Sequence, residues 1–270
     1  MDEVAEELEA KLAEAAGMIL ESEYLVAMVG AGLSVESGIP PYRGPDGLWT
    51  KYGEPPMLSY RDFIRDPKLW WEERLRGEVE PGNPIYEMKV AVDRAEPNPG
   101  HYALVEMEQW GLLKNTVTQN VDDLHRRAGS ETLLEIHGNR TWLRCIGCGL
   151  RRPRDGFPLA ELPPRCPECD GVLKADTVMF GEPIPSEVMK ACWEQAELCD
   201  CMLLIGTSGM VNPAAQLPLV AREHGATLIE INPYQTALTP WCALALTGPS
   251  GEVLPSLVDR LRRDRAAASH

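Results

Sequence analysis

Two pairs of closely spaced cysteines constrain the fold of this chain more than any other feature. They read Cys145-x2-Cys148 and Cys166-x2-Cys169, with 17 residues between the pairs. Four thiolates at this spacing predict a closed tetrahedral zinc site of the ribbon type. Such a site leaves no coordination position open for water or substrate, so we expect the zinc to be structural. The other four cysteines lie in apolar helix or strand patterns, where a thiol serves as a small core side chain.

Short apolar runs alternate with amphipathic segments along most of the remaining chain. The apolar runs predict strands at 24–29, 112–118, 133–136, 201–205 and 227–231. Helical periodicity predicts helices over 2–21, 100–112, 185–198, 212–224 and 252–263. Strands separated by helices of this length indicate an α/β fold with a parallel, doubly wound sheet. A segment rich in proline and aromatic residues interrupts the pattern, with helical pieces near 59–76 and 84–94.

A glycine-rich stretch follows the first predicted strand and reads Val29-Gly-Ala-Gly-Leu-Ser-Val-Glu-Ser-Gly-Ile-Pro-Pro-Tyr-Arg43. Small residues at this place let backbone N–H groups approach a ligand, typically a pyrophosphate, and Arg43 adds a fixed cation. The stretch departs from the dinucleotide fingerprint of dehydrogenases, because Val35 replaces the third glycine and no acidic residue follows about 20 positions on. On its own, the pattern also fits an ordinary tight turn.

Polar residues follow other predicted strands. The run Thr118-Gln-Asn-Val-Asp122 follows the second strand, Gly206-Thr-Ser208 follows the fourth and Asn232 follows the fifth. Open α/β sheets bind ligands at the carboxyl ends of their strands, so these residues predict one shared site. Helix capping by an Asn or Asp is the alternative for part of the first run. His137 ends the third strand, and its side chain suits proton transfer near neutral pH, although a lone histidine is more often structural.

The overall charge limits the partners. The formal net charge is −15, which argues against sequence-independent binding of nucleic acid. No apolar run reaches the roughly 18 residues that a membrane span needs. The N-terminal segment is acidic and amphipathic, unlike a secretory signal. We therefore expect a cytoplasmic protein with neither nucleic acid nor a membrane as its partner.

With these motifs in place, the chain resembles the sirtuin family of NAD-dependent protein deacylases. The matching motifs, in the family's order, are GAGLSVESGIPPYRGPDGLW (30–49), TQNVDDLHRRAG (118–129), LEIHGN (134–139), the cysteine ribbon (145–169), FGE (180–182), GTS (206–208) and IN (231–232). Together they are far more specific than any one of them, and they span nearly the whole chain.

The resemblance implies a Rossmann-like parallel-sheet domain that binds NAD and a smaller domain made of a helical insertion and the zinc ribbon. On this basis the large domain takes residues 1–44, 95–140 and 175–265. The helical module with the cofactor loop takes 45–94, the ribbon takes 141–174, and 266–270 form a disordered tail. Acyl-lysine peptide and NAD would meet in the cleft between the domains.

The resemblance also assigns roles to individual residues. His137 resembles the general base, and Asn120 and Asp122 resemble the catalytic residues that hold the ribose and the nicotinamide amide. The matching cofactor-binding positions are Gly30, Ala31, Gly32, Ser34, Ile39, Tyr42, Arg43, Trp49, Gln119, Asn120, Asp122, Gly206, Thr207, Ser208 and Asn232. The positions that match the peptide-binding strands are Val178, Phe180, Gly181, Gly209 and Val211. Cys145, Cys148, Cys166 and Cys169 would hold one Zn²⁺.

The implied activity is deacylation of protein lysines, most simply deacetylation, with NAD as co-substrate. The products would be nicotinamide, free lysine and O-acyl-ADP-ribose. Mono-ADP-ribosyl transfer from the same NAD site, removal of long-chain or other acyl groups, and catalytically silent NAD sensing stay open as alternatives.

The choice of acyl group is a separate question. One branch of the family binds acidic acyl chains through a Tyr-x-x-Arg pair, and here Trp71 and Arg74 stand at that spacing. Because the tyrosine is missing, we expect acetyl or apolar acyl groups to be preferred over succinyl. The oligomeric state is left open, with a monomer as the expectation.

Overall fold

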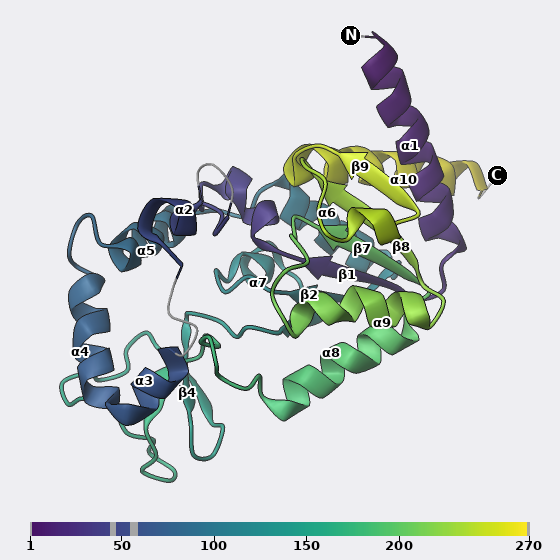
Figure 1. Cartoon of the computed structure of the whole chain (residues 1–270). Helices are drawn as coiled ribbons and strands as arrows, with labels where there is room; N and C mark the ends of the chain where they lie inside the picture. Colours follow the sequence, from purple (N-terminus) through teal and green to yellow (C-terminus); the bar gives the residue numbers. More distant parts are fainter. Residues whose placement is uncertain (1, 44–46, 55–58, 269–270) are drawn as a thin grey trace.

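The computed structural model describes residues 2–43, 47–54 and 59–268, which form two lobes (Figure 1). The larger lobe contains a six-stranded parallel sheet in the order β3-β2-β1-β7-β8-β9. Its strands are β1 (Leu25–Val29), β2 (Leu113–Thr118), β3 (Leu133–Glu135), β7 (Cys201–Ile205), β8 (Thr227–Asn232) and β9 (Leu244–Thr247). The chain winds outward from β1 in one direction and from β7 in the other, so the carboxyl ends of these two strands form the switch point of the sheet. The predicted α/β fold is therefore confirmed.

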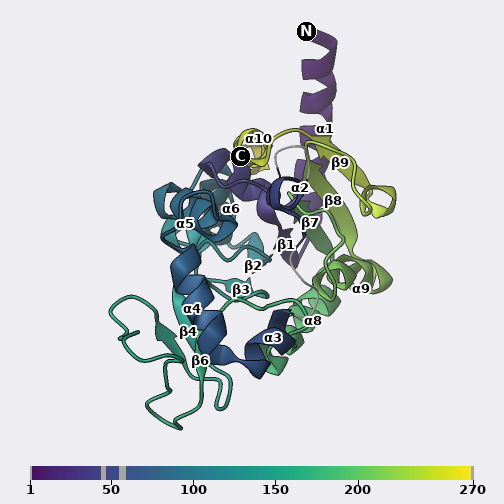
Figure 2. The ribbon, with the colours of Figure 1, turned by 60° about the vertical axis from the view of Figure 1, so that its left-hand side comes forward.

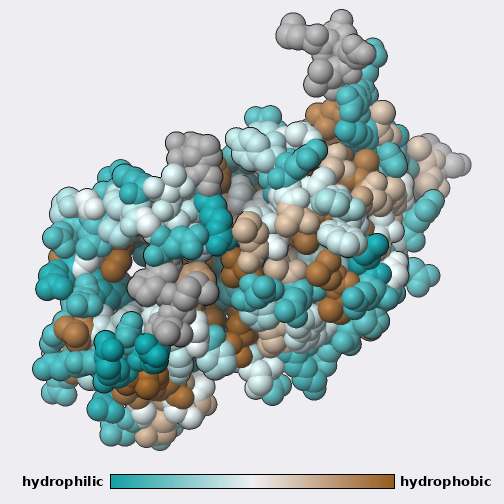
Figure 3. Space-filling model, viewed as in Figure 1, coloured by the Kyte–Doolittle hydropathy of each residue, from teal (hydrophilic) through white to brown (hydrophobic). Residues whose placement is uncertain are grey.

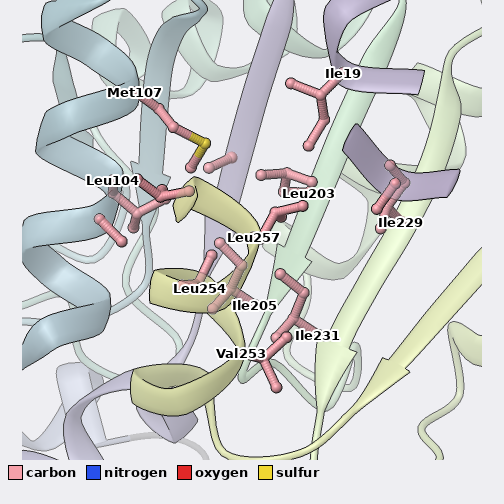
Figure 4. Close-up of a cluster of buried hydrophobic side chains, with 14 of the residues drawn as sticks. Ile19, Leu104, Met107, Leu203, Ile205, Ile229, Ile231, Val253, Leu254 and Leu257 are labelled. Atoms are coloured by element: carbon pink, nitrogen blue, oxygen red, sulfur yellow. The ribbon is translucent and has the colours of Figure 1, made fainter. Parts of the chain in front are cut away.

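Helices cover both faces of this sheet. One face packs against α1 (Asp2–Glu21), α6 (Pro99–Gln109) and α10 (Ser250–Ala268), and Figure 4 shows Ile19, Leu104 and Leu257 pointing toward Leu203 and Ile229. The other face packs against α8 (Ser186–Leu198) and α9 (Leu217–Glu223). All five residues of β1 and all five of β7 are buried, as central strands of a two-sided parallel sheet require.

The smaller lobe combines two segments that are far apart in the sequence (Figures 1 and 2). The antiparallel sheet of the ribbon has the order β5-β4-β6, from Arg151–Pro153, Trp142–Cys145 and Leu173–Ala175. It packs against α3 (Ser59–Arg65) and α4 (Pro67–Gly77) through one core that includes Phe63, Trp71 and Leu173. The Trp71 Nε1–H donates to the Leu173 carbonyl at 2.9 Å, so the helical insertion and the ribbon are one folded unit.

Two further helices connect the lobes. α2 (Leu48–Tyr52) lies in the segment after the glycine stretch, and α5 (Pro84–Arg94) follows α4. The end of α5 packs on the larger lobe, because Val92 and Ala95 share a core cluster with Ile39 and Leu124. The insertion is thus anchored to the ribbon at one end and to the sheet domain at the other.

Several boundaries differ from the sequence prediction. The helical piece near 59–76 is two helices, since the Asp66 carboxylate caps α4 by accepting the Leu69 N–H at 3.0 Å, with Pro67 as the first helical residue. The disordered tail from residue 266 is wrong for 266–268, which continue α10. The guanidinium of Arg265 lies over the Trp110 ring and holds this last turn against the domain. Residues 44–46 of the glycine-rich motif and 269–270 of the tail lie outside the described residues. Across the described part of the chain, no helix combines the length and apolar character that a membrane crossing requires.

Candidate active site

The expected site residues gather at the carboxyl edge of the sheet and on the segment that leaves the ribbon after β6. They lie at Gly30, on η1 (Ala31–Ser37, a 3-10 helix) and the loop after it, on α2, in the connections after β2, β3, β6 and β7, and at the last residue of β8. On the face shown in Figure 3, hydrophobic residues are visible near the junction of the two lobes.

Gly30, Gly32 and Gly206 allow the loops after β1 and β7 to touch backbone to backbone. A Cβ on Gly32 would lie 2.6 Å from the Gly206 Cα, a distance that no side chain tolerates. The Gly30 N–H donates to the Ile205 carbonyl at 2.9 Å, and the Gly32 N–H donates to the Gly206 carbonyl at 2.8 Å. These N–H groups are therefore directed at protein carbonyls and not outward at a ligand. The glycines shape the site by close packing, which the sequence pattern alone did not distinguish from direct ligand contact.

Ser34, Asn120 and Asp122 form a buried hydrogen-bonded cluster at this switch point. The Ser34 hydroxyl donates to the Asp122 carboxylate at 2.7 Å and accepts from the Asn120 Nδ2 at 3.1 Å. Asn120 also donates to the Gly30 carbonyl at 3.1 Å. Burial raises the pKa of Asp122, while the Ser34 hydrogen bond lowers it. Each of the three side chains is less than a tenth exposed, so the cluster is rigid and ready to orient a polar group.

The capping alternative holds for part of this cluster. The second carboxylate oxygen of Asp122 accepts the Leu124 N–H at 3.0 Å, at the start of α7 (Leu124–Ala128). Asp122 thus bonds the first residue of α7 and Ser34 with the same carboxylate, whereas Asp123 holds the N-cap position and Asn120 does not bond the helix.

His137 is held in one tautomer by its surroundings. Its Nδ1 lies 3.2 Å from the Gln119 carbonyl, which can only accept, so Nδ1 carries the proton and Nε2 keeps its lone pair. Burial lowers the pKa of the imidazole, opposed by the hydrogen bond to Gln119. The ring is therefore neutral at pH 7 and able to accept a proton at Nε2.

The glycine after this histidine is required by its neighbours. Gly138 has φ +76°, and a Cβ there would lie 1.7 Å from the Asp176 carbonyl oxygen. The His137 carbonyl accepts the Val178 N–H at 2.9 Å. The candidate base is consequently joined by main-chain contacts to the segment that contains Val178, Phe180 and Gly181.

Three further expected residues meet at the ends of β2, β7 and β8. The Gln119 Nε2 donates to the Thr207 hydroxyl at 2.8 Å, and the Asn232 Nδ2 donates to the Thr207 carbonyl at 3.2 Å. Thr207 is buried and Ser208 beside it is exposed. Thr207 and Asn232 lie at the ends of β7 and β8, on the other side of the switch point from β2 and β3.

An aromatic group joins the cofactor loop to the expected peptide segment. The ring centroids of Trp49 and Tyr42 are 5.3 Å apart, and those of Trp49 and Phe180 are 5.7 Å apart. The guanidinium of Arg43 lies 4.4 Å from the Trp49 centroid. Trp49 therefore contacts residues from both expected binding sets, while Ile39 is a buried core residue behind them.

The two expected peptide-binding segments are held by different parts of the fold. The Phe180 carbonyl accepts the Tyr60 N–H at 3.1 Å, which fastens the first segment to α3. Gly209, at φ +65°, packs against Leu238 from the connection between β8 and β9, and Val211 follows it.

The four cysteines of the ribbon converge as predicted. Their sulfur atoms lie within 4.8 Å of one another, with Cys145 and Cys169 at 3.5 Å and Cys148 and Cys166 at 3.7 Å. Sulfur atoms about 2.3 Å from a tetrahedral zinc lie at nearly these separations from each other, so the donor set fits Zn²⁺.

Asn98 anchors the glycine-rich stretch, and it was not among the residues predicted from the sequence. Its Nδ2 donates to the Leu33 carbonyl at 2.7 Å and to the Ser37 hydroxyl at 3.0 Å, while its Oδ1 caps α6 by accepting the Gly100 N–H at 2.9 Å. Asn before Pro99 was a readable capping signal. The contact with η1 was not readable, because more than 60 residues separate the partners.

Comparison with known proteins gives a consistent result. The model of the Sir2 family matches residues 30–213. An NAD-dependent protein deacylase of Pyrococcus abyssi is 42% identical over 93% of this chain and 98% of its own length. The NAD-dependent protein deacylase 2 of Pyrobaculum aerophilum is 43% identical over 92% of this chain and 95% of its own.

Solved structures agree with these relatives. A Sir2 homologue in complex with NAD superposes with a TM-score of 0.77 at 39% identity, covering 93% of this chain and 94% of that one. Sir2Af2 bound to a myristoylated histone peptide superposes with a TM-score of 0.68 at 32% identity, covering 96% of this chain and 99% of that one.

Proposed function

The chain belongs to the Sir2 family, and we propose from this premise that His137 is the general base of its deacylation reaction. The protein is an NAD-dependent protein deacylase, as relatives that match it over nearly its whole length are named. The proposed role of His137 rests on its imidazole, which is neutral and held in one tautomer. The residue bonds Gln119 at the proposed cofactor edge and Val178 of the proposed peptide segment.

NAD would supply the ribose carbon that bonds the acyl carbonyl oxygen as its bond to nicotinamide, the leaving group, breaks. The residues present fit such a co-substrate. Asn120 and Asp122 are proposed to orient the nicotinamide and its ribose, since both are buried and fixed by Ser34. His137 Nε2 would accept the proton of a ribose hydroxyl, because its lone pair is free of the Gln119 bond. Thr207, with its neighbours, would hold the adenosine end.

The protein therefore contributes positioning and one base, and it needs no nucleophilic serine or cysteine. The thiols of Cys192, Cys199 and Cys201 are unsuited to that role, because burial raises their pKa to about 12. The ribbon cysteines would hold one Zn²⁺ in a closed site that takes no part in the chemical steps.

The proposed substrate is an acyl-lysine side chain of a protein, bound in extended form between Val178–Gly181 and Gly209–Val211 by strand pairing. We propose acetyl or apolar acyl groups over succinyl. Trp71 is completely buried with its Nε1–H donated to the Leu173 carbonyl, and Arg74 lies 3.2 Å from the Glu78 carboxylate. Neither side chain is thus available to an acidic acyl group. The cytoplasm is the proposed compartment, since thiol ligands require reducing conditions, and a monomer is the proposed state.

A panel of acyl-lysine peptides with NAD, read by nicotinamide release, tests the proposal. Acetyl-lysine should be turned over faster than succinyl-lysine, and His137→Ala should lose activity while keeping its zinc. His224→Ala is the matched control, because His224 is an exposed histidine at the end of α9. Activity that survives in His137→Ala would remove the proposed base. Label from NAD retained on the protein would indicate ADP-ribosyl transfer instead.

A further inference from the structure

Lys174, in β6, is completely buried, which is rare for a lysine and requires partners. Its ammonium has three acceptors for its three N–H donors. It donates to the Ala175 carbonyl at 2.7 Å and to the Thr177 carbonyl at 2.8 Å, and it lies 3.2 Å from the Glu182 carboxylate. All three acceptors belong to the segment that leads from the ribbon into the expected peptide-binding strand.

Glu182 closes the other end of this segment. Its Oε2 accepts the Met179 N–H at 2.8 Å, and its Oε1 accepts from the Arg144 guanidinium at 2.9 Å. Arg144 in turn lies 3.2 Å from the Asp176 carboxylate. Hydrogen bonds and ion pairs of buried charged groups therefore hold residues 175–182 at both ends, and Val178–Gly181 lie between these contacts.

Stability alone does not account for this arrangement. Buried ion pairs contribute little net stability, because desolvation offsets most of their attraction, and apolar residues often replace them without loss. A buried lysine that bonds the main chain of a short, otherwise irregular segment instead fixes the shape of that segment.

We propose that Lys174 is a positioning residue for substrate binding, which holds Val178–Gly181 in the shape that pairs with the acyl-lysine peptide. The inference rests on the proposed peptide-binding role of this segment. Lys174 touches neither peptide nor NAD. It acts through Glu182 and the carbonyls of Ala175 and Thr177.

The charge on Lys174 depends on pH in an accessible range. The charged and titratable groups around it and its partners are Glu182 and Asp176 of its own segment, Arg144 of β4, Arg151 of β5 and Tyr60 of α3. Burial lowers the pKa of Lys174 to about 8, opposed by the Glu182 carboxylate. The ammonium is thus present below that pH and is lost as the pH rises through it, together with one donor and the attraction to Glu182.

Lys174→Met, which keeps an unbranched side chain of nearly the same length and removes every donor, tests the proposal in the full-length enzyme. The KM for acetyl-lysine peptide should rise about tenfold. The KM for NAD and the zinc content should not change, and Lys174→Arg should restore part of the affinity. Lys190→Met is the matched control, since Lys190 forms an exposed pair with Glu194 on α8 and should leave every constant unchanged.

The pH dependence of the KM for the peptide distinguishes a positioning role of Lys174 from a merely structural one. In the wild type, the peptide KM should rise between about pH 7 and pH 9, and Lys174→Arg should flatten this rise. Glu182→Gln keeps the shape of the side chain and removes the opposing charge, so its peptide KM should begin to rise at a lower pH. Glu182→Gln therefore still tests the inference if Lys174→Met does not fold. An unchanged peptide KM in Lys174→Met, or a flat profile in the wild type and Glu182→Gln, would overturn the inference while leaving deacylation intact. Absence of nicotinamide release by the wild type would instead overturn the proposed function.

Discussion

Asn98 and Asn83 offer a controlled measurement of how firmly the glycine-rich stretch is held. Both residues precede a proline and cap a helix, and Asn83 accepts the Ile85 N–H at 3.0 Å. Only Asn98 also donates to the cofactor side of the site, at Leu33 and Ser37. Replacing each with alanine removes a helix cap, which accepts the N–H groups of Gly100 and His101 at Asn98 and that of Ile85 at Asn83, so the difference between the two variants reports chiefly the bonds to η1.

The expected magnitudes follow from the bonds that each variant loses. Loss of a cap costs about 1 kcal/mol, and each further net hydrogen bond contributes about 1 kcal/mol. Asn83→Ala should therefore lower the free energy of unfolding by about 1 kcal/mol and Asn98→Ala by about 3 kcal/mol. Urea unfolding followed by tryptophan fluorescence measures both values. Because η1 carries Ser34, Asn98→Ala should also raise the KM for NAD, whereas Asn83→Ala should not.

Two results would refute this reasoning. Equal losses of stability in the two variants would mean that the bonds to Leu33 and Ser37 contribute nothing. If Asn98→Ala lowered the free energy of unfolding by the expected amount of about 3 kcal/mol but left the KM for NAD unchanged, η1 would not need this anchor to bind the co-substrate.

Three other outcomes are expected. His101 and His125 are buried, which lowers their pKa to about 3 and about 4. As the pH falls below 6.5, these imidazoles therefore bind protons in the unfolded chain before they do so in the folded protein. Urea unfolding at about pH 5 should show that the free energy of unfolding is lower by about 2 kcal/mol per imidazole than at neutral pH. Gly138→Ala should destabilise far more than Gly111→Ala, because both have positive φ but only Gly138 would clash, with Asp176. Removal of zinc with a chelator should release one equivalent, measured with a colorimetric indicator, and abolish peptide-dependent nicotinamide release.

The elements that the sequence predicts well are those whose signal is local. The apolar runs of β1 and β7 are buried on both sides, and the cysteine spacing brings four sulfur atoms together. β9 escaped prediction because Leu244–Thr247 is short and alternates buried with less buried residues at a sheet edge. The end of α10 was missed because its last turn depends on the contact between Arg265 and Trp110.

The parts of the site that could not be predicted depend on contacts between distant residues. The glycine pattern indicated close approach of a backbone, but nothing in it distinguished a ligand from the Gly206 loop, which lies beyond residue 200. The roles of Asn98 and Lys174 also depend on distant partners. From the sequence alone, Asn98 is interpreted only as a helix cap and Lys174 as a surface lysine. The type of a residue shows which interactions its side chain can make, whereas the fold determines which partner it makes them with.

The ribbon contacts the candidate active site through main-chain hydrogen bonds, although its four cysteines form a separate cluster. β4 and β6 meet the active-site segment directly, because the Asp176 N–H donates to the Trp142 carbonyl at 2.9 Å, and Val178 then bonds His137. Arg144, which binds both Asp176 and Glu182, is the neighbour of Cys145 in the sequence. A ribbon that opened would release Asp176 from Trp142 and with it the segment that bonds His137 through Val178. The proposed zinc would thus be remote from the bond that breaks, yet the position of the proposed base would depend on it.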